Sequence, residues 1–225
     1  MSAAGGERPS LCGWLADLLF PPKCVFCGGL LPDGVRDLCP KCQRDLPWCA
    51  GQEALRFGET FALCVSPLHY RDQVRTSFHR YKFQGQSSYA GPYGRLMARC
   101  IQTHLDGQYD LITWVPLSRR RRRARGYDQA MLLAEAAGRA LDRPVAGTLT
   151  KGRHTAAQSG LDREEDRRIN IRGAYQIADP ALVRGKRLLL VDDIITTGST
   201  LSEAAQTLYG AGAVKIFCAA LARAH

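Results

Sequence analysis

The sequence has no long apolar run and no secretory leader pattern. No segment approaches the roughly 18–20 consecutive apolar residues that cross a bilayer, which excludes a transmembrane segment. Arg8 is the only basic residue before the apolar stretch 11–20, so the basic n-region of a signal peptide is missing. At 225 residues and 45% hydrophobic content, the chain can bury a core, which argues against a disordered or fibrous protein. We therefore expect a globular, cytoplasmic protein.

Acidic residues are scarce relative to basic ones. There are 21 Asp and Glu against 31 Lys and Arg, which gives a formal net charge of +10. The segment 118–172 alone holds 14 basic residues against 7 acidic ones, so most of the excess is local. A basic surface favours anionic partners such as phosphorylated metabolites, nucleic acids or acidic lipids. The charge does not choose among these partners, but its concentration in one segment suggests a binding site there.

The first twenty residues contain one short amphipathic pattern. Leu11, Trp14, Leu15 and Leu18 recur at helical spacing, and Pro21 ends a helix at that point. The pattern predicts an N-terminal helix that packs on its own domain. Contact with a membrane surface is the alternative.

The nine cysteines are unevenly distributed. Cys24 and Cys27 form one C-x-x-C pair, Cys39 and Cys42 form a second, and the residues between them include the Gly, Pro and Asp of a tight hairpin. Two such pairs allow four thiolates to converge on one tetrahedral Zn²⁺. Disulfides, which are unusual without a secretory signal, and redox thiols are the alternatives. The spacing predicts a structural zinc module, with Cys49 as a spare ligand or part of a second site.

The remainder of the chain has the pattern of an α/β domain. Gly, Gln and Glu between residues 51 and 58 separate it from the cysteine module, so we expect domains at 1–50 and 58–225. Strands that are apolar throughout and separated by helices are typical of a parallel sheet covered by helices on both faces. The sequence predicts strands at 61–66, 111–115, 187–191 and 214–222, and helices at 89–105, 127–141 and 200–209.

Two adjacent acids follow the predicted strand 187–191, and a turn rich in hydroxyl groups comes after them. Ligands of parallel α/β sheets bind at the carboxyl ends of the strands, where Asp192 and Asp193 are expected. Carboxylates accept hydrogen bonds from the hydroxyl groups of a sugar, and the backbone amides of the turn can bind a phosphate. A ribose 5-phosphate meets both requirements; two acids that cap a helix are the alternative. The turn residues are Thr196, Thr197, Gly198, Ser199 and Thr200.

The stretch "VDDIITTGST" resembles the phosphoribosyl pyrophosphate (PRPP) binding motif of type I phosphoribosyltransferases. The whole chain is similar to the ComF family, in which a short helix, a four-cysteine zinc module and a phosphoribosyltransferase domain follow in this order. The matching features span nearly the full length and include "LLFPPKCVFC", "LCPKC", "YKFQG", "VPLSRRRRRARGYDQA" and "RHTAAQSGLDREEDRRIN". The chain departs from the family pattern at Asp128, where the R-G-F/Y-N-Q motif has Asn.

The resemblance implies a type I phosphoribosyltransferase fold preceded by a zinc-ribbon module, with a site for PRPP and Mg²⁺. The segment after strand 111–115 corresponds to the pyrophosphate loop, so Arg119 and Arg120 are expected to bind the diphosphate, because guanidinium groups pair with phosphate oxygens. Asp192 and Asp193 are expected to hold the ribose hydroxyls. The segment 153–170 resembles the family's flap, which closes over the reaction.

Three functions follow from the resemblance. The first is transfer of ribose 5-phosphate from PRPP to an unidentified nucleophilic acceptor, with release of pyrophosphate. The second is a PRPP-sensing adaptor with little or no turnover. The third is a competence factor that acts with DNA or the DNA-uptake machinery, for which the arginine run and the zinc module are candidate contacts. Fold alone does not decide among them.

Overall fold

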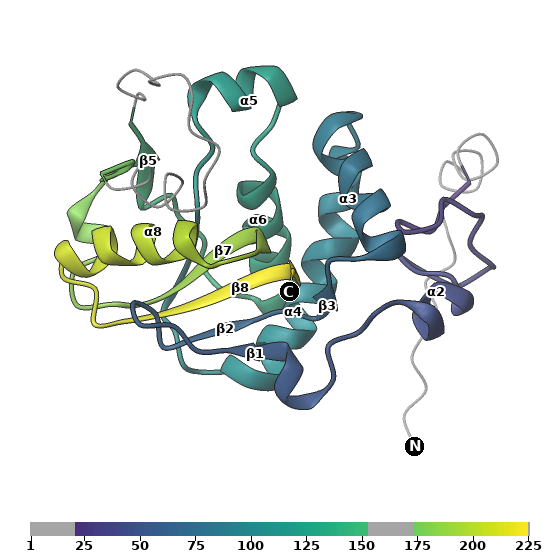
Figure 1. Ribbon diagram of the computed structural model, residues 1–225, viewed down its shortest axis with the longest axis horizontal. Helices are drawn as coiled ribbons and strands as arrows, with labels where there is room; N and C mark the ends of the chain where they lie inside the picture. Colours follow the sequence, from purple (N-terminus) through teal and green to yellow (C-terminus); the bar gives the residue numbers. More distant parts are fainter. Residues whose placement is uncertain (1–20, 153–172, 225) are drawn as a thin grey trace. The chain divides into compact units, whose positions relative to one another are not determined.

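The computed structural model describes residues 21–152 and 173–224, and the chain divides into two units, Met1–Leu46 and Pro47–His225 (Figure 1). The predicted N-terminal helix and the flap-like segment 153–170 lie outside the described residues. Composition places the division at 51–58, whereas the structure assigns these residues to the second unit. The reason is backbone pairing, because Cys49 N donates to Pro67 O at 2.9 Å and Leu55 pairs with Val65.

The first unit is built around its cysteines. Helix α2 (Pro40–Asp45) begins after Cys39, whose sulfur accepts a hydrogen bond from Cys42 N at 3.4 Å. Pro40 suits the first helical position because its missing N–H has no acceptor there. Phe26 is almost fully buried, and a bridge joins Lys23 to Leu30. The unit thus has a very small apolar core.

A mixed sheet forms the centre of the second unit. Its order is β1 (Leu55–Arg56), β2 (Leu63–Val65), β8 (Lys215–Arg223), β7 (Arg187–Ile195) and β4 (Leu111–Trp114), and β3 (Leu68–His69) also pairs with β8. Strands β2, β8, β7 and β4 are parallel, and only β1 is antiparallel to its neighbour. A separate antiparallel pair consists of β5 (Leu149–Lys151) and β6 (Tyr175–Ile177).

Helices cover both faces of this sheet. Helix α8 (Ser199–Gly210) lies on one face, and α4 (Ala90–Leu105) lies on the other with α6 (Gln129–Leu141) packed against it (Figure 1). Alternate residues of β7, such as Leu188 and Leu190, pack in a cluster with Leu201 and Leu208 of α8, as the alternation of strand side chains requires. The predicted α/β architecture is confirmed.

Other elements frame the sheet. Helix α3 (Asp72–Phe83) and helix α5 (Arg119–Arg125) were not predicted from the sequence. Short 3₁₀ turns occur at Gly51–Ala54, Ser87–Tyr89 and Pro180–Leu182. Among the described residues, no helix is both long enough and apolar enough to cross a bilayer.

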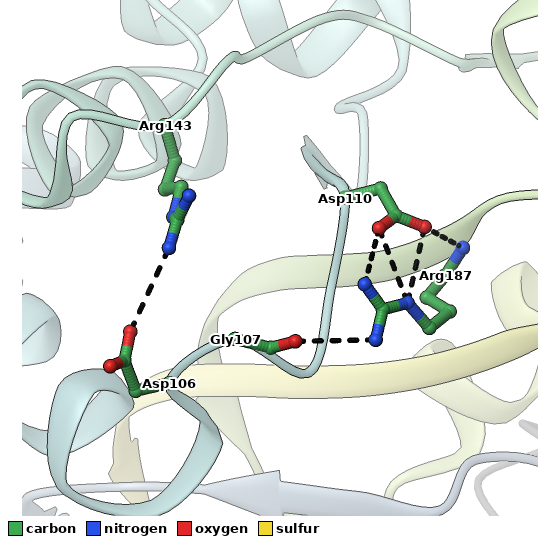
Figure 2. Close-up of polar contacts among 5 residues, drawn as sticks. All are labelled: Asp106, Gly107, Asp110, Arg143 and Arg187. Atoms are coloured by element: carbon green, nitrogen blue, oxygen red, sulfur yellow. Dashed lines mark hydrogen bonds and ion pairs between the residues drawn. The ribbon is translucent and has the colours of Figure 1, made fainter.

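An ion pair joins the amino ends of β4 and β7. Figure 2 shows the Arg187 guanidinium between Asp110 and the Gly107 carbonyl. Its Nη2 lies 2.5 Å from Asp110 Oδ1, and Nη1 donates to Gly107 O at 3.2 Å. Hydrogen bonds from Arg187 lower the pKa of Asp110 to about 2. This pair links β4 and β7 at the edge of the sheet opposite the carboxyl ends of the strands.

Strand β7 is longer than predicted. The sequence suggests that it ends at Val191, because two acids follow, but the strand continues to Ile195. Pairing with β8 stabilises the extension, since Asp192 lies opposite Ala220 and Ile194 lies opposite Ala222. Asp192 and Asp193 are therefore within the strand and not beyond it.

Candidate functional site

Asp192 and Asp193 lie at an open edge of β7. Val115 N donates to Val191 O at 2.9 Å, so the backbone groups of Val191 face β4. Those of Asp193, two residues further on, face the same side, but β4 has already ended there. The Asp193 N–H donates instead to Asp192 Oδ1 at 2.8 Å. This bond turns the Asp192 carboxylate toward the open edge of the strand.

The two carboxylates have different electrostatic surroundings. Lys82 Nζ lies 2.7 Å from Asp193 Oδ2, and only 17% and 15% of these side chains are exposed. Burial, together with the charge of Asp193, raises the pKa of Asp192 to about 7, although the charges of Lys82 and Lys151 act in the opposite direction. Asp192 therefore exchanges a proton near neutral pH.

The turn after β7 leads directly into α8. Gly198 precedes the helix with φ at +86°, a left-handed conformation that costs residues with a Cβ about 1–2 kcal/mol. Gly198 has no side chain to cap the first turn of this 12-residue helix. Thr197 Oγ1 lies 2.8 Å from Ser199 Oγ and accepts from Ser199 N at 3.3 Å. An uncapped helix N-terminus beside hydroxyl groups has the donors of an anion site.

Arg56 holds this turn from the other side. Its Nη2 donates to Thr197 O at 2.7 Å, and its Nη1 donates to Thr196 O. The described peptide bonds are all trans, and the C=O and N–H of a trans peptide point in opposite directions. The N–H groups of Thr197 and Gly198 are thus directed away from Arg56. The guanidinium fixes which side of the turn presents amide donors.

A cleft of about 460 Å³ borders the turn. Its walls come from the segment after β1 and from α8. The Phe57 ring on one wall is 73% exposed, while Thr197, Ser199, Ser202 and Gln206 supply polar groups from the other. Arg56 also lines this cleft, so the cleft reaches the Thr197 and Ser199 hydroxyls from the side of the turn that faces Arg56, and not from the side to which the Thr197 and Gly198 amides point.

Asp128 organises the segment after β4. It is 4% exposed and caps α6 by accepting from Met131 N at 3.3 Å. Its other oxygen accepts from Leu117 N at 2.8 Å. Burial raises the pKa of this carboxyl group. Two different oxygens accept from two amides, so a carboxylate satisfies both donors here, whereas the single oxygen of Asn satisfies only one.

The arginine run forms a helix where the sequence predicts a loop. Arg119 and Arg120 begin α5 and are exposed. The pKa of Lys151 is lowered, first by burial and second by the positive charge of Arg121. Lys151 Nζ donates to the Tyr175 hydroxyl at 3.2 Å. The charge of Lys151 also acts on Asp192, so Arg121 and Lys151 are the cations of these two segments whose charges act near the acids.

The four predicted zinc ligands come together in the first unit. The sulfur atoms of Cys24, Cys27, Cys39 and Cys42 all lie within 4.8 Å of one another, and those of Cys27 and Cys39 are 3.7 Å apart. Zn–S bonds of about 2.3 Å in a tetrahedron separate the sulfurs by about 3.8 Å, so the site fits Zn²⁺. Burial and the neighbouring thiols raise the pKa of Cys42, because the negative charges of adjacent thiolates repel one another. A cation at the centre of the cluster would offset this repulsion. The four-cysteine module is confirmed.

Sequence reasoning missed three cations of the site. Arg56 falls in the stretch read as a domain boundary, and Lys151 has no motif around it. Lys82 does belong to a family feature, "YKFQG", but the sequence alone assigns no function to this stretch. These side chains reach the site through tertiary contacts, which local patterns do not encode.

Two family models match the chain. The model for the phosphoribosyl transferase domain matches residues 128–225, and the model for the double zinc ribbon domain matches residues 15–66. Together with the sheet and the cysteine cluster, they define a type I phosphoribosyltransferase fold preceded by a zinc-ribbon module.

Relatives extend this likeness over most of the chain. Competence protein F of Haemophilus influenzae is 32% identical over 90% of this chain and 97% of its own length. The DNA utilization protein YhgH of Escherichia coli K12 is 31% identical over 81% of this chain and 83% of its own, and competence protein ComFC of Bacillus subtilis is 27% identical over 88% and 84%. The chain belongs to the competence protein F, or ComF, family.

Proposed function

We propose that the protein binds PRPP with Mg²⁺ and transfers ribose 5-phosphate to a nucleophilic acceptor, with release of pyrophosphate. One observation carries the proposal: Asp192 and Asp193 lie at an open strand edge, and an uncapped helix begins a few residues later. Carboxylates accept hydrogen bonds from neighbouring sugar hydroxyls, and the turn amides bind the 5'-phosphate.

The residues around the acids have distinct roles in this reaction. The bond between C1 of the ribose and the diphosphate oxygen breaks, and its electron pair leaves with pyrophosphate. The acceptor's lone pair forms the new bond to C1, and the acceptor's proton passes to solvent. Mg²⁺, when bound, offsets the charge of the diphosphate. Asp192 and Asp193 hold the hydroxyls, while Arg119, Arg120, Arg121 and Lys151 stabilise the departing charge.

Zinc has a structural role in this proposal. Cys24, Cys27, Cys39 and Cys42 fill all four tetrahedral positions with sulfur, which leaves no position for a substrate. The first unit has a very small core of its own, so the metal supplies most of its folding energy.

The test is incubation with PRPP, Mg²⁺ and a panel of nucleobases and amines while pyrophosphate release is followed. The proposal expects release that depends on one class of acceptor and disappears in the Asp192→Ala/Asp193→Ala variant. Binding of PRPP without release from any acceptor would replace the transferase with a PRPP-sensing adaptor that uses the same residues.

A second candidate function concerns DNA. It is favoured by the relatives named competence and DNA utilization proteins and by the exposed arginines of α5. Counterion release makes DNA binding by such a helix fall steeply with salt. Salt-dependent binding of DNA that survives Asp192→Ala and is lost with the α5 arginines would support this role beside, or in place of, transfer.

A further inference from the structure

Lys82 contacts the acid pair from outside the segment that the phosphoribosyl transferase model matches. It is the penultimate residue of α3, and its Nζ lies 2.7 Å from Asp193 Oδ2. Both side chains are largely buried, so water screens the pair much less than it screens an exposed ion pair. The contact is therefore a built feature of the site and not a solvated surface pair.

The end of α3 is held in place on both sides of this contact. The Tyr81 hydroxyl donates to Gln129 O at 3.0 Å, and the Tyr127 hydroxyl donates to Tyr81 O. Tyr81 is fully buried. The Lys82 ammonium also lies 5.5 Å from the centre of the Phe78 ring. These bonds tie α3 to the start of α6, so Lys82 is presented to Asp193 by a rigid framework.

The pair leaves each acid with one occupied oxygen and one open oxygen. Asp192 Oδ1 accepts from Asp193 N, and Asp193 Oδ2 is paired with Lys82. Within residues 21–152 and 173–224, Asp192 Oδ2 and Asp193 Oδ1 have no hydrogen-bond donor. Two hydroxyl groups on adjacent carbons need two acceptors, and these two carboxylate oxygens provide them. Without Lys82, the Asp193 carboxylate is free to rotate and lies uncompensated beside a second acid.

We propose that Lys82 is a positioning residue that holds the Asp193 carboxylate in place so that the two open carboxylate oxygens accept the vicinal hydroxyls of a ribose phosphate. The proposal rests on the proposed function, because it assigns Lys82 to the sugar half of the same site. Lys82 acts through Asp193 and not on the phosphate groups. Its loss therefore affects the ribose and leaves pyrophosphate binding unchanged.

A double-mutant cycle tests this role. Calorimetry with ribose 5-phosphate and, separately, pyrophosphate is carried out on the wild type, Lys82→Met, Asp193→Asn and the double variant. Lys82→Met should weaken ribose 5-phosphate about tenfold, as expected for loss of a charge-assisted contact, and leave pyrophosphate affinity unchanged. In the Asp193→Asn background the same change should have almost no further effect. Lys82→Arg, which keeps the charge, should recover part of the affinity.

A matched control uses the ion pair at the opposite edge of the sheet. Arg187→Met breaks the contact with Asp110, so it should lower the melting temperature without changing either affinity. A tenfold loss that persists in the Asp193→Asn background, or an equal loss for pyrophosphate, would overturn the proposal, because Lys82 would then bind the ligand directly.

Thermal unfolding of the same four proteins separates this proposal from the proposed function. The pair predicts non-additive melting temperatures, and additive values would show that Lys82 does not hold Asp193. If the wild type binds neither PRPP nor ribose 5-phosphate but the melting temperatures are non-additive, the proposed function is refuted. Lys82 then remains the residue that orients Asp193.

Discussion

Arg56 and Thr197 are 141 residues apart in the sequence, yet the Arg56 guanidinium donates to the Thr197 carbonyl at 2.7 Å. A second bond to the Thr196 carbonyl fixes the preceding peptide group as well. Strand β1, which lies outside the matched phosphoribosyl transferase segment, thus shapes the turn whose amides are proposed to bind the 5'-phosphate. The carbonyl oxygens, which would repel a phosphate, face Arg56, and the N–H groups of the same peptides point the other way.

Replacement of Arg56 should weaken binding of the 5'-phosphate. Arg56→Met removes both bonds and frees the two peptide groups to rotate, so ribose 5-phosphate and PRPP should each bind about tenfold more weakly. Arg56→Lys should be intermediate, because an ammonium lacks the planar fork that engages two carbonyls. Pyrophosphate affinity, measured by calorimetry, serves as the internal control. Unchanged affinity for ribose 5-phosphate in Arg56→Met would mean that the turn holds its shape without the guanidinium.

A side chain at Gly198 should abolish phosphate binding through backbone strain. A Cβ there meets nothing closer than 3.8 Å, so crowding within the protein is not the reason. The reason is the φ of +86°. A β-branched residue rarely adopts this conformation, so the backbone of the turn changes and its amides move. Gly198→Val should lose ribose 5-phosphate and PRPP together, and should lower stability by about 1–3 kcal/mol. Retention of wild-type affinity in a folded Gly198→Val protein would place the 5'-phosphate elsewhere.

Features encoded by local spacing were predictable from the sequence. The two C-x-x-C pairs, the start of α8 and the β4 strand follow from short motifs and hydrophobic runs. The length of β7 was not predictable, because Asp192 and Asp193 resemble the end of a strand, while pairing with the apolar β8 extends it. Helix α5 was hidden by an arginine run without periodicity, although Ser118 before it and Gly126 after it are typical helix caps.

The contacts of Arg56 and Lys82 were beyond reach for another reason. Each joins segments more than a hundred residues apart, and neither partner carries a local pattern that names the other. Asp128 is a third case, since its two amide donors become apparent only once the segment after β4 and the start of α6 are adjacent. The contacts that these cations make at the site can therefore be recognised only in the folded structure.

The raised pKa of Asp192 predicts a pH-dependent stability. The folded-state pKa is about 7 against a usual value of 3.8, so the folded protein keeps a proton that the unfolded chain releases. The bound proton therefore stabilises the folded state fully below about pH 4, and this stabilisation is lost as the pH rises toward 7. Asp192→Asn is neutral throughout, so its gain in melting temperature over the wild type should grow between pH 4 and 7 and then level off.

A second variant for this titration is Asp193→Asn. It leaves Lys82 without its carboxylate partner and removes a charge that raises the pKa of Asp192, so its stability should vary less with pH than that of the wild type. Because one pKa unit corresponds to about 1.4 kcal/mol, the Asp192→Asn effect should exceed 1 kcal/mol. A difference between Asp192→Asn and wild type that does not vary with pH would show that Asp192 ionises normally.

The zinc site should be required for the first unit and not for the second. Protein purified under reducing conditions should carry one Zn²⁺ per chain, and replacement of Cys24, Cys27, Cys39 or Cys42 by Ser should release it. Structural zinc contributes about 10–16 kcal/mol of apparent binding energy in small modules. Cys49→Ser is the control and should retain the metal, because Cys49 is outside the four-sulfur cluster. Loss of PRPP binding on chelation, with the second unit still folded, would contradict a purely structural role.

The most direct test of the account is calorimetry of PRPP with Mg²⁺ on the wild type and on Asp192→Ala/Asp193→Ala. Both acids lie at the open edge of β7 and are expected to accept the ribose hydroxyls, and loss of hydrogen bonds to a charged acceptor costs about 1.5–3 kcal/mol. The account predicts that PRPP affinity falls by one to two orders of magnitude while the circular dichroism spectrum is unchanged. Wild-type affinity in the double variant would contradict it, because PRPP would then bind at some other site.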